Sequence, residues 1–364
     1  METLHIYGCG KTGSGKSTFV KNEIYADIIQ RNRPIIFIDP HGHDAYDLLD
    51  ALPRKDFKRT VIMDFSDYNY IVSFNPLTAG AVHTLSGLKS IWLESWGPRM
   101  NNILRYALLV LEQNPRTVLT DITQLLHDDL YRADLLKKVT NPAVKRFFKP
   151  RGEFDREYAT ARDHPLSPIL NKIGEIAASE ISRFLCDRDP SITFDRILTE
   201  KLILIVNLSK PSLGDEAAAI AGSLITTTLR AALLNQPTPC SLYADEFQTY
   251  GTSMFSSMLS EMRKFGLKMV LTHQFIHQIP PMLQKAILGN VSRRVIFNVD
   301  YEDAEILAKP YNTIMQDFTT TLATLPDFEA YDNGRHVIMP AFQPPKGKLH
   351  HARLTSRRFF ARQL

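Results

Sequence analysis

Short apolar runs alternate with amphipathic stretches in the first 80 residues and again after residue 197. The runs are rich in Ile, Leu, Val and Phe, which is typical of strands buried on both faces of a parallel sheet. The expected strands are residues 4–7, 34–38, 60–65, 202–208, 240–246, 268–274 and 294–299, and the expected helices are residues 17–30, 44–52, 216–234, 253–264 and 283–289. This βαβα alternation predicts an α/β fold with a mostly parallel sheet flanked by helices.

The pattern changes between residues 81 and 196, where apolar residues recur at helical spacing and strand-like runs are absent. Thr120-Asp121 and Asn141-Pro142 are typical helix starts within this stretch. We therefore expect an all-helical domain inserted into the sheet domain. The expected division is residues 1–80 and 197–345 for the two parts of the sheet domain, 81–196 for the insertion and 346–364 for a basic C-terminal tail.

The first expected strand leads directly into a phosphate-binding sequence. Residues 10–18 fit the pattern G-x-x-x-x-G-K-[ST], and the strand before and helix after them argue against a chance match. In such a loop several backbone N–H groups and the positive end of a helix dipole converge on the phosphates. Lys16 would contact the β- and γ-phosphates, and the Ser17 hydroxyl would hold Mg²⁺. The nucleotide-binding residues are therefore expected to be Gly10, Lys11, Thr12, Gly13, Ser14, Gly15, Lys16, Ser17 and Thr18, with ATP and Mg²⁺ as ligands, in a RecA-like P-loop NTPase.

Acidic and amide side chains end two later strands. Phosphoryl transfer needs a metal ion, an oriented water and a group that neutralises charge in the transition state. Asp245 is expected to join the Mg²⁺ shell, and Glu246 to polarise the attacking water. Gln274 would sense the γ-phosphate or orient the water. The alternative is that Asp245, Glu246 and Gln274 are merely polar residues at strand ends. The phosphate loop upstream favours catalytic roles for them.

Two more positions leave alternatives open. Asp39 follows the strand 34–38, either beside the nucleotide or in a simple Asp-Pro turn. Arg263 lies at a helix end, where it either complements the helix dipole or enters the site of a neighbouring subunit as an arginine finger.

Composition sets limits on the class of protein. The chain has 364 residues, of which 44% are hydrophobic and 23% charged, as in a globular protein. The isolated Cys9, Cys186 and Cys240 argue against a zinc site or disulfide scaffold and indicate a reducing, cytoplasmic compartment. We expect no signal peptide and no transmembrane segment, because no apolar run approaches about 18 residues.

Charge hints at a polyanionic partner. The formal net charge is +4, and residues 346–364 carry six Lys or Arg and no acid. This tail is either solvated or in contact with a nucleic-acid backbone or a protein partner.

In this order, the motifs resemble those of the FtsK–HerA superfamily of DNA-pumping ATPases, especially the cytoplasmic motors of type IV secretion coupling proteins (TraG/TraD-like). The motifs are residues 10–18, 38–42 (Ile-Asp-Pro-His-Gly), 74–77 (Phe-Asn-Pro-Leu), 96–99 (Trp-Gly-Pro-Arg), 208–210 (Leu-Ser-Lys), 245–248 (Asp-Glu-Phe-Gln), 263–266 (Arg-Lys-Phe-Gly), 272–274 (Thr-His-Gln) and 289–291 (Gly-Asn-Val). Coupling proteins usually carry N-terminal transmembrane helices and HerA proteins a small barrel. Their absence here suggests a stand-alone motor or one attached to another subunit.

The resemblance implies a homo-oligomeric ring, usually hexameric, that hydrolyses ATP and moves DNA through a central pore. Lys16 and Glu246 are the catalytic residues expected from the motifs themselves. The resemblance adds Gln274, which matches the family's strand-end glutamine, and Arg263, which matches its interface arginine eleven residues earlier. Residues 81–196 resemble the all-alpha domain that caps the pore and helps engage DNA. The motifs do not distinguish single-stranded from double-stranded DNA as the substrate. The alternatives are a nucleotide-dependent switch or assembly protein without pumping, and a viral-packaging or transposition-associated ATPase of the same superfamily.

Overall fold

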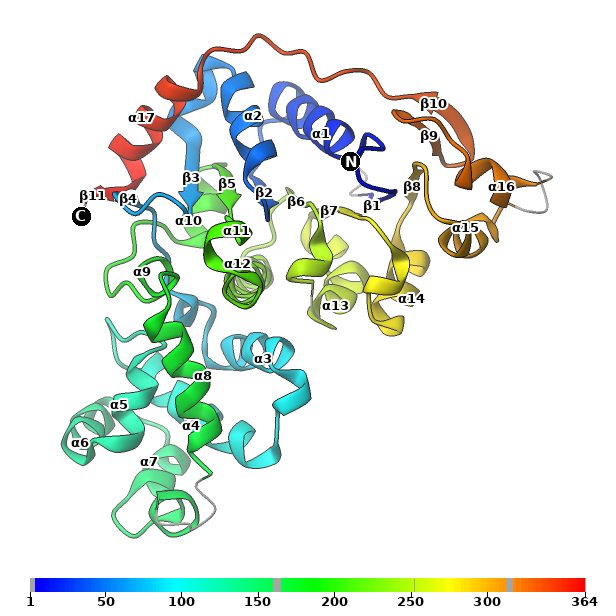
Figure 1. The fold of residues 1–364 in the computed structure, drawn as a ribbon. Coiled ribbons are helices and arrows are strands. Elements are labelled where there is room, and N and C mark those ends of the chain that lie inside the picture. The colour runs from blue at the N-terminus through cyan, green and yellow to red at the C-terminus, as the bar shows by residue number, and fades with distance from the viewer. Residues whose placement is uncertain (1–3, 160–164, 252, 312–316, 364) are drawn as a thin grey trace.

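A mixed β-sheet forms the centre of the computed structural model, which describes residues 4–159, 165–251, 253–311 and 317–363 (Figure 1). Within these ranges the sheet has nine strands in the order β10-β9-β8-β1-β7-β6-β2-β5-β3. The parallel strands are β1 (Ile6–Cys9), β2 (Ile35–Asp39), β3 (Thr60–Asp64), β5 (Ile203–Asn207), β6 (Cys240–Ala244), β7 (Leu267–His273) and β8 (Arg293–Ile296). The expected fold class is confirmed, although β1 lies two residues later than predicted.

Helices cover both faces of the sheet. Figure 1 shows α1 (Lys16–Gln30), α2 (His43–Ala51) and α17 (Leu349–Phe360) on one side, and α12 (Asp215–Asn235), α13 (Ser253–Glu261) and α14 (Pro281–Asn290) on the other. Alternate residues of each buried strand face these two layers, so Ile35 and Phe37 join one apolar core while Ile36 and Ile38 join the other. The remaining helices of this part are α11 (Lys210–Leu213), α15 (Tyr301–Ala308) and α16 (Phe318–Ala323).

The segment from 81 to 199 contains helices and no strand among its described residues. These helices are α3 (Ala81–Ile91), α4 (Pro98–Glu112), α5 (Asp121–His127), α6 (Asp129–Lys138), α7 (Pro142–Phe148), α8 (Ser167–Ala178), α9 (Ser182–Leu185) and α10 (Phe194–Thr199). Helix α3 packs against α12 so closely that a Cβ added at Gly87 would lie 2.6 Å from the Thr227 hydroxyl oxygen. The domain at residues 81–196 stays a prediction, and the helix at its carboxyl end, α10, ends at Thr199, three residues after the predicted boundary.

Helix α12 is long and apolar enough to cross a membrane by length and composition alone. However, 78% of its most apolar window is buried inside the protein, between the sheet and α3. This burial is typical of a helix in the core of a globular domain.

The C-terminal segment differs from the expected basic tail. Antiparallel strands β9 (Glu329–Asp332) and β10 (Arg335–Ile338) extend the sheet, and the chain then crosses α1 and α2 to reach α17 (Figure 1). Helix α17 is not solvated on all sides, because Ala352, Ser356 and Phe360 are buried. Its Arg357 pairs with Asp67 at 2.5 Å. A two-stranded sheet of β4 (Tyr70–Ile71) and β11 (Arg362–Gln363) fixes the end of this segment.

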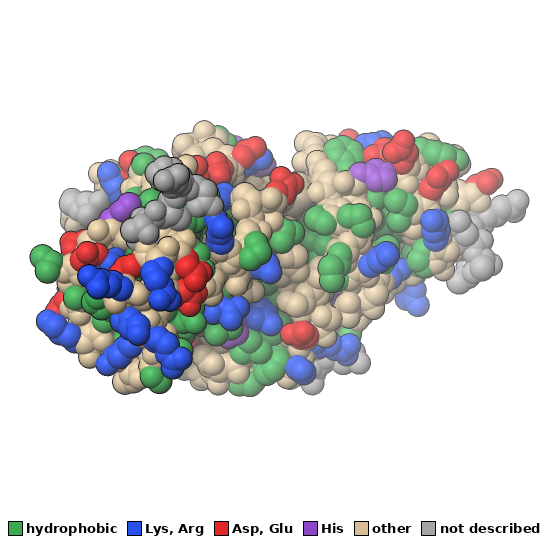
Figure 2. Space-filling view, turned by 90° about the horizontal axis from the view of Figure 1, so that it is seen from below, with side chains coloured by type: hydrophobic (Ala, Val, Ile, Leu, Met, Phe, Trp, Pro, Cys, Tyr) green, Lys and Arg blue, Asp and Glu red, His purple; other side chains and the backbone are tan. Residues whose placement is uncertain are grey.

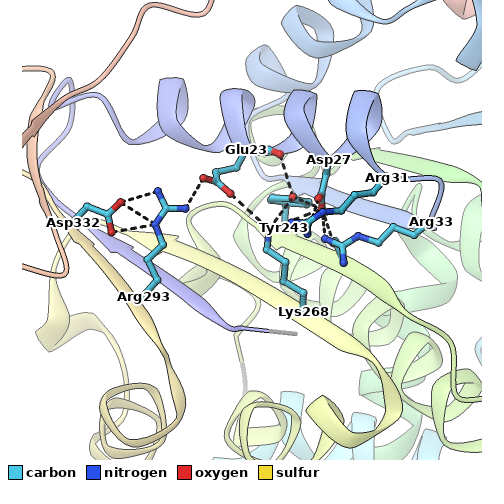
Figure 3. A network of polar contacts seen from close by, with 9 residues as sticks. Glu23, Asp27, Arg31, Arg33, Tyr243, Lys268, Arg293 and Asp332 are labelled. Carbon is cyan, nitrogen blue, oxygen red and sulfur yellow. Dashed lines mark hydrogen bonds and ion pairs between the residues drawn. The ribbon is translucent and has the colours of Figure 1, made fainter. Parts of the chain in front are cut away.

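A buried ionic network joins α1 to the sheet beneath it (Figure 3). Asp27 accepts hydrogen bonds from Tyr243 (2.7 Å) and Arg33 (2.5 Å), and the Lys268 ammonium lies 3.9 Å away. At the other end, Arg293 on β8 contacts Glu23 at 2.6 Å and Asp332 at 2.8 Å. Burial alone would raise the pKa of Asp27, but the Lys268 charge and these hydrogen bonds hold it below 3.8. The contacts of Asp27 therefore stabilise the fold fully only while this carboxylate is ionised.

We expect Asp27→Asn to destabilise the protein by about 3 kcal/mol at pH 7, because it leaves buried cations without their carboxylate. The folded pKa of Asp27 is depressed, so its contribution is present above the unfolded pKa and is lost as the pH falls through the folded value. The loss measured by thermal denaturation should therefore shrink below about pH 4. Asp134→Asn is the control, since the Asp134–Lys137 pair is exposed and should contribute less than about 1 kcal/mol. Equal shifts for the two variants would contradict the buried network.

Candidate active site

The candidate site lies at the carboxyl edge of the sheet, where the loop after β1 meets the ends of β7 and β6. Strand β7 lies directly beside β1, and β6 lies on the far side of β7. Neighbouring strands are about 4.8 Å apart, so the backbones of β1 and β6 are separated by roughly 10 Å, a gap that side chains can bridge. This strand order brings distant parts of the sequence to one place.

The phosphate loop has the backbone shape that its glycines predict. Gly13 and Gly15 have positive φ angles of 83° and 110°, which residues with a Cβ rarely adopt. A Cβ at Gly10 would lie 2.5 Å from the Cβ of Phe297. The Lys11 N–H donates to the Asn298 carbonyl at 2.7 Å, which fixes the loop to the end of β8. Ser17 and Thr18 lie half-buried in the first turn of α1.

Lys16 lies inside this loop and is 5% exposed. Its ammonium donates to the carbonyls of Gly10 at 2.7 Å and Lys11 at 3.0 Å. It also lies 3.9 Å from Glu246 Oε1. The lysine of the phosphate loop and the glutamate after β6, 230 positions apart in the sequence, thus share one buried site.

A chain of side-chain hydrogen bonds crosses the site. Gln274 donates from Nε2 to Glu246 Oε1 at 3.0 Å, and Thr12 donates to Gln274 Oε1 at 3.1 Å. Gln248 donates to the other Glu246 oxygen at 2.6 Å. Glu246 itself has a left-handed backbone with φ 40°, a conformation that costs about 1–3 kcal/mol and is concentrated at functional sites. Glu246 is thus held in one orientation between Lys16 and Gln274.

Asp245 is buried beside Glu246. Thr272 on β7 donates to Asp245 Oδ1 at 2.5 Å. Burial raises the pKa of Asp245 to about 7, with a further increase from the Glu246 charge that the Thr272 hydrogen bond partly offsets. A nearby cation would reverse this effect and favour the carboxylate.

The donor set suits a magnesium–nucleotide complex better than a metal held by protein alone. The described residues contain no cluster of three or more His, Cys, Asp or Glu that could hold a metal ion. Mg²⁺ usually binds one or two protein oxygens together with phosphates and waters, and Ser17 and Asp245 could supply those oxygens. The Ser14 hydroxyl is buried in the phosphate loop with no hydrogen-bond partner in the described structure, so it is available to a ligand oxygen.

Asp39 has the contacts of a turn residue. Its two carboxylate oxygens accept backbone N–H groups of His41 and Ala45, each at 2.8 Å, and so stabilise the start of α2. Burial raises the pKa of Asp39, and these hydrogen bonds partly offset the increase. This favours the turn over a direct role at the nucleotide.

Arg263 is not brought together with the other candidate residues. The helix predicted for residues 253–264 ends at Glu261, and Arg263 lies in the 3₁₀ turn η6 (Met262–Phe265) before β7. The seven residues of β7 span roughly 20 Å, so Arg263 lies at the opposite edge of the sheet from Gln274. There its charge adds to burial in lowering the pKa of His5 to about 4. Arg263 therefore faces away from the phosphate loop of its own chain.

Sequence reasoning missed several contributors. Thr12 was expected only as a loop residue, whereas its hydroxyl holds Gln274, and Thr272 was not singled out as the partner of Asp245. His273 was also missed: it is fully buried, its ring contacts the Tyr7 hydroxyl at 2.5 Å, and burial lowers its pKa to about 3. The sequence places Thr12 in the phosphate loop and Thr272 and His273 in the motif 272–274 at the end of β7, but it does not indicate their contacts.

A parallel sheet, a glycine-rich loop before α1 and strand-end acids beside the loop lysine define this protein as a P-loop NTPase. A family model for the central domain of helicase HerA matches residues 3–226. The match covers more than half of the chain, which therefore belongs to this family. The predicted membership of the FtsK–HerA superfamily is thus confirmed. A search among curated proteins found no significant match.

Solved structures share the fold at low sequence identity. Unbound conjugative coupling protein TrwB has a TM-score of 0.66 with 15% identity, over 95% of this chain and 88% of that one. TrwB in complex with ADP and Mg²⁺ has a TM-score of 0.62 with 14% identity, over 95% and 89%. VirB4 of Thermoanaerobacter pseudethanolicus has a TM-score of 0.65 with 14% identity, over 94% and 90%.

We expect Asp245→Asn to stabilise the protein relative to the wild type at pH 8 but not at pH 4, with Mg²⁺ chelated. The folded pKa of Asp245 is raised, so the stability that the protonated acid contributes is present below the unfolded pKa, near 3.9. It falls by about 1.4 kcal/mol per pH unit as the pH rises to about 7. Asparagine does not titrate and can still accept the Thr272 hydrogen bond. Thermal midpoints measured from pH 4 to 8 test this, and a difference that does not change with pH would contradict the raised pKa.

Proposed function

We propose that this chain is an ATP-hydrolysing motor that moves DNA and works as a cytoplasmic ring of identical subunits, most simply a hexamer. The observation that carries the proposal is the convergence of Lys16, Glu246 and Gln274 on one buried site. Membership of the HerA family and the fold shared with TrwB and VirB4 support it. The TrwB complexes with ADP and Mg²⁺ and with an ATP analogue support ATP and Mg²⁺ as ligands.

The residues suggest a division of labour in hydrolysis. The loop 10–18 would hold the phosphates through its N–H groups, with Lys16 moving from the loop carbonyls to the β- and γ-phosphate oxygens. Ser17 and Asp245 would hold Mg²⁺, which neutralises charge on the phosphates when bound. Glu246 would accept a proton from the attacking water. Gln274 would hold the Glu246 carboxylate in the orientation that faces this water at the γ-phosphate. Because Gln274 also contacts Thr12, it connects the phosphate loop to Glu246, the proposed general base.

Arg263 completes the site only if a second copy of the chain supplies it. It lies at the opposite edge of the sheet, so it would act on the phosphate loop of a neighbouring subunit in a ring. An arginine supplied in this way neutralises charge in the transition state and typically increases turnover by about 10³–10⁵. This supports a ring over a monomeric nucleotide-dependent switch.

We expect Lys16→Ala to abolish ATP turnover and Glu246→Gln to bind ATP while turning it over at least about 100-fold more slowly. The first variant loses charge at the phosphates, and the second loses only the base. Steady-state turnover and equilibrium ATP binding separate these effects. Lys55→Ala, an exposed lysine on the short turn before β3, is the control. Wild-type turnover in Lys16→Ala would refute the site.

DNA dependence separates the motor from the switch. A motor should hydrolyse ATP faster with DNA and displace a third strand from a triplex in an ATP-dependent reaction. A switch should bind a partner in a nucleotide-dependent way without displacing the strand. No stimulation by single- or double-stranded DNA of any length would contradict the motor.

We expect Arg263→Ala to bind ATP normally but to lose most turnover, and mixing it with Lys16→Ala to restore part of that turnover. In mixed rings some intact phosphate loops face an intact Arg263 from the neighbouring Lys16→Ala subunit. Turnover is measured at a fixed total concentration against each variant alone. No recovery, in a mixture shown to exchange subunits, would contradict a role for Arg263 in the neighbouring site.

A further inference from the structure

We propose that a groove between the helical segment and the sheet domain binds the sugar–phosphate backbone of single-stranded DNA, an inference that rests on the proposed function. The groove consists of two adjoining cavities of about 680 and 300 Å³ that share Lys89 and Leu93. The larger cavity lies beside the start of α4 and the smaller one between α3, α12 and α13. Their volumes match the range of roughly 300–1,000 Å³ found for ligand sites.

The groove is lined by cations. Its basic residues are Lys89, Arg99, Arg105 and Arg230, and no Asp or Glu is among its described lining residues. Two acids contact lining residues from outside the two cavity linings: Glu261 pairs with Arg230 at 3.4 Å, and Glu153 accepts a hydrogen bond from Asn102 at 3.1 Å. Four basic side chains thus line one groove, and Glu261 partly offsets the charge of one of them, Arg230. Such a concentration attracts a polyanion.

The same end of the molecule is basic at its surface. Figure 2 shows Lys and Arg side chains gathered on the end formed by the helical segment. Exposed basic residues of α6, α7 and the turn after α7 are Lys137, Lys138, Lys145, Arg146, Lys149 and Arg151. Lys137 is paired with Asp134 at 3.0 Å, and the other five add positive charge to this end of the molecule.

Hydrogen-bond donors accompany the charges. Ser86 and Ser253 line the smaller cavity, and Asn101 lines the larger one. Ser90, Ser257 and Asn102 also line the groove, but their side chains donate hydrogen bonds within the protein. Arg230 Nε is buried without a hydrogen-bond partner in the described structure. Most protein–DNA hydrogen bonds reach phosphate and sugar oxygens from side chains of these types. Arg230 therefore has donor capacity that a phosphate in the smaller cavity would use.

An aromatic side chain favours a single strand over a duplex. Trp96 lines the larger cavity, and its indole N–H donates to Asn101 Oδ1 at 3.1 Å, which fixes the orientation of the ring. Stacking on an aromatic ring requires a base that is not paired and stacked within a duplex, and contributes about 1–3 kcal/mol per base. Lys89 and Trp96 line the same cavity, so a strand lying in it would meet a cation and an aromatic ring together.

The groove is joined to the active site by a short segment. Arg230 belongs to α12, and Ser253 begins α13 seven residues after Glu246. Between them, the Tyr250 hydroxyl donates to the Asp245 carbonyl at 3.1 Å, and Ser223 of α12 donates to the Tyr250 carbonyl at 3.0 Å. Movement of α12 or α13 on binding a strand would therefore act directly on the loop that carries the catalytic acids.

The test measures binding of a fluorescent oligothymidylate by anisotropy at fixed salt, to the wild type and to Lys89→Gln, Arg230→Gln and Trp96→Ala. We expect each variant to bind roughly tenfold more weakly. The salt dependence should become shallower by about one unit for each lost phosphate contact. Trp96→Ala should weaken binding of the single strand more than binding of a duplex of equal length. Lys55→Gln is the charge-matched control and should bind like the wild type.

The outcomes separate this proposal from the proposed function. Unchanged oligothymidylate binding in all three groove variants would overturn the groove even if the wild type hydrolyses ATP. Equal losses on single strand and duplex in Trp96→Ala would overturn the single-strand assignment. Wild-type protein that binds oligothymidylate through the groove but never hydrolyses ATP would instead overturn the motor. Arg230→Lys should recover part of the affinity lost in Arg230→Gln, which distinguishes lost charge from misfolding.

Discussion

The position of α1 depends on the buried Asp27 carboxylate and the cations that surround it. The amino end of this helix is the phosphate loop, and its second half carries Glu23 and Asp27. Burying these charges costs free energy unless each one is paired, and here Lys268, Arg33 and Arg293 provide the pairs from separate strands and loops. Lys268 and Arg293 anchor the helix to β7 and β8, and the hydrogen bond from Tyr243 anchors it to β6. These three strands end beside the loop. An apolar contact would hold α1 against the sheet but would allow it to slide. Directed ion pairs fix its register, and so fix where the phosphate loop lies relative to Glu246.

The candidate active site contains more buried acidic groups than basic ones. Asp39, Asp245 and Glu246 are buried and close enough for their charges to interact, and the Lys16 ammonium lies 3.9 Å from Glu246. The raised pKa of Asp245 is the physical consequence, since burial and the neighbouring acids favour its neutral form. A site with this imbalance gains free energy when a divalent cation enters together with a nucleotide, because the cation restores the ionised carboxylate. The hydrogen bonds among Thr12, Gln274 and Glu246 already orient the side chains, so little ordering entropy remains to be lost on binding.

The sequence predicted the parts of the fold whose geometry is local. The glycines of the loop specify its backbone, and apolar runs specify buried strands, so the sheet, its flanking helices and the positions of Lys16, Asp245 and Glu246 at strand ends were predictable. The order of the strands in the sheet was not predictable, because no local sequence feature indicates that β7 lies between β1 and β6. The contacts of Thr12, Thr272 and His273 follow from that order. The packing of α17 was missed for a different reason: its apolar positions are few, and its arginines find Asp64 and Asp67 only after the chain has crossed α1 and α2.

The position of Arg263 and the position of the groove together constrain how a ring could use ATP. Arg263 precedes β7 and Gln274 follows it, so one strand connects the edge that would face a neighbour to the edge that holds the nucleotide. Helix α13 leads into η6 and also forms a wall of the groove through Ser253 and Ser257. A displacement of α13 would therefore reach Arg263 at its carboxyl end and the Glu246 loop at its amino end. Because helices are stiff along their axes and the core around α13 is densely packed, such a displacement would be shared rather than absorbed. DNA, the nucleotide and the neighbouring subunit would then act on the same helix, which is the minimum that a motor requires to couple their states.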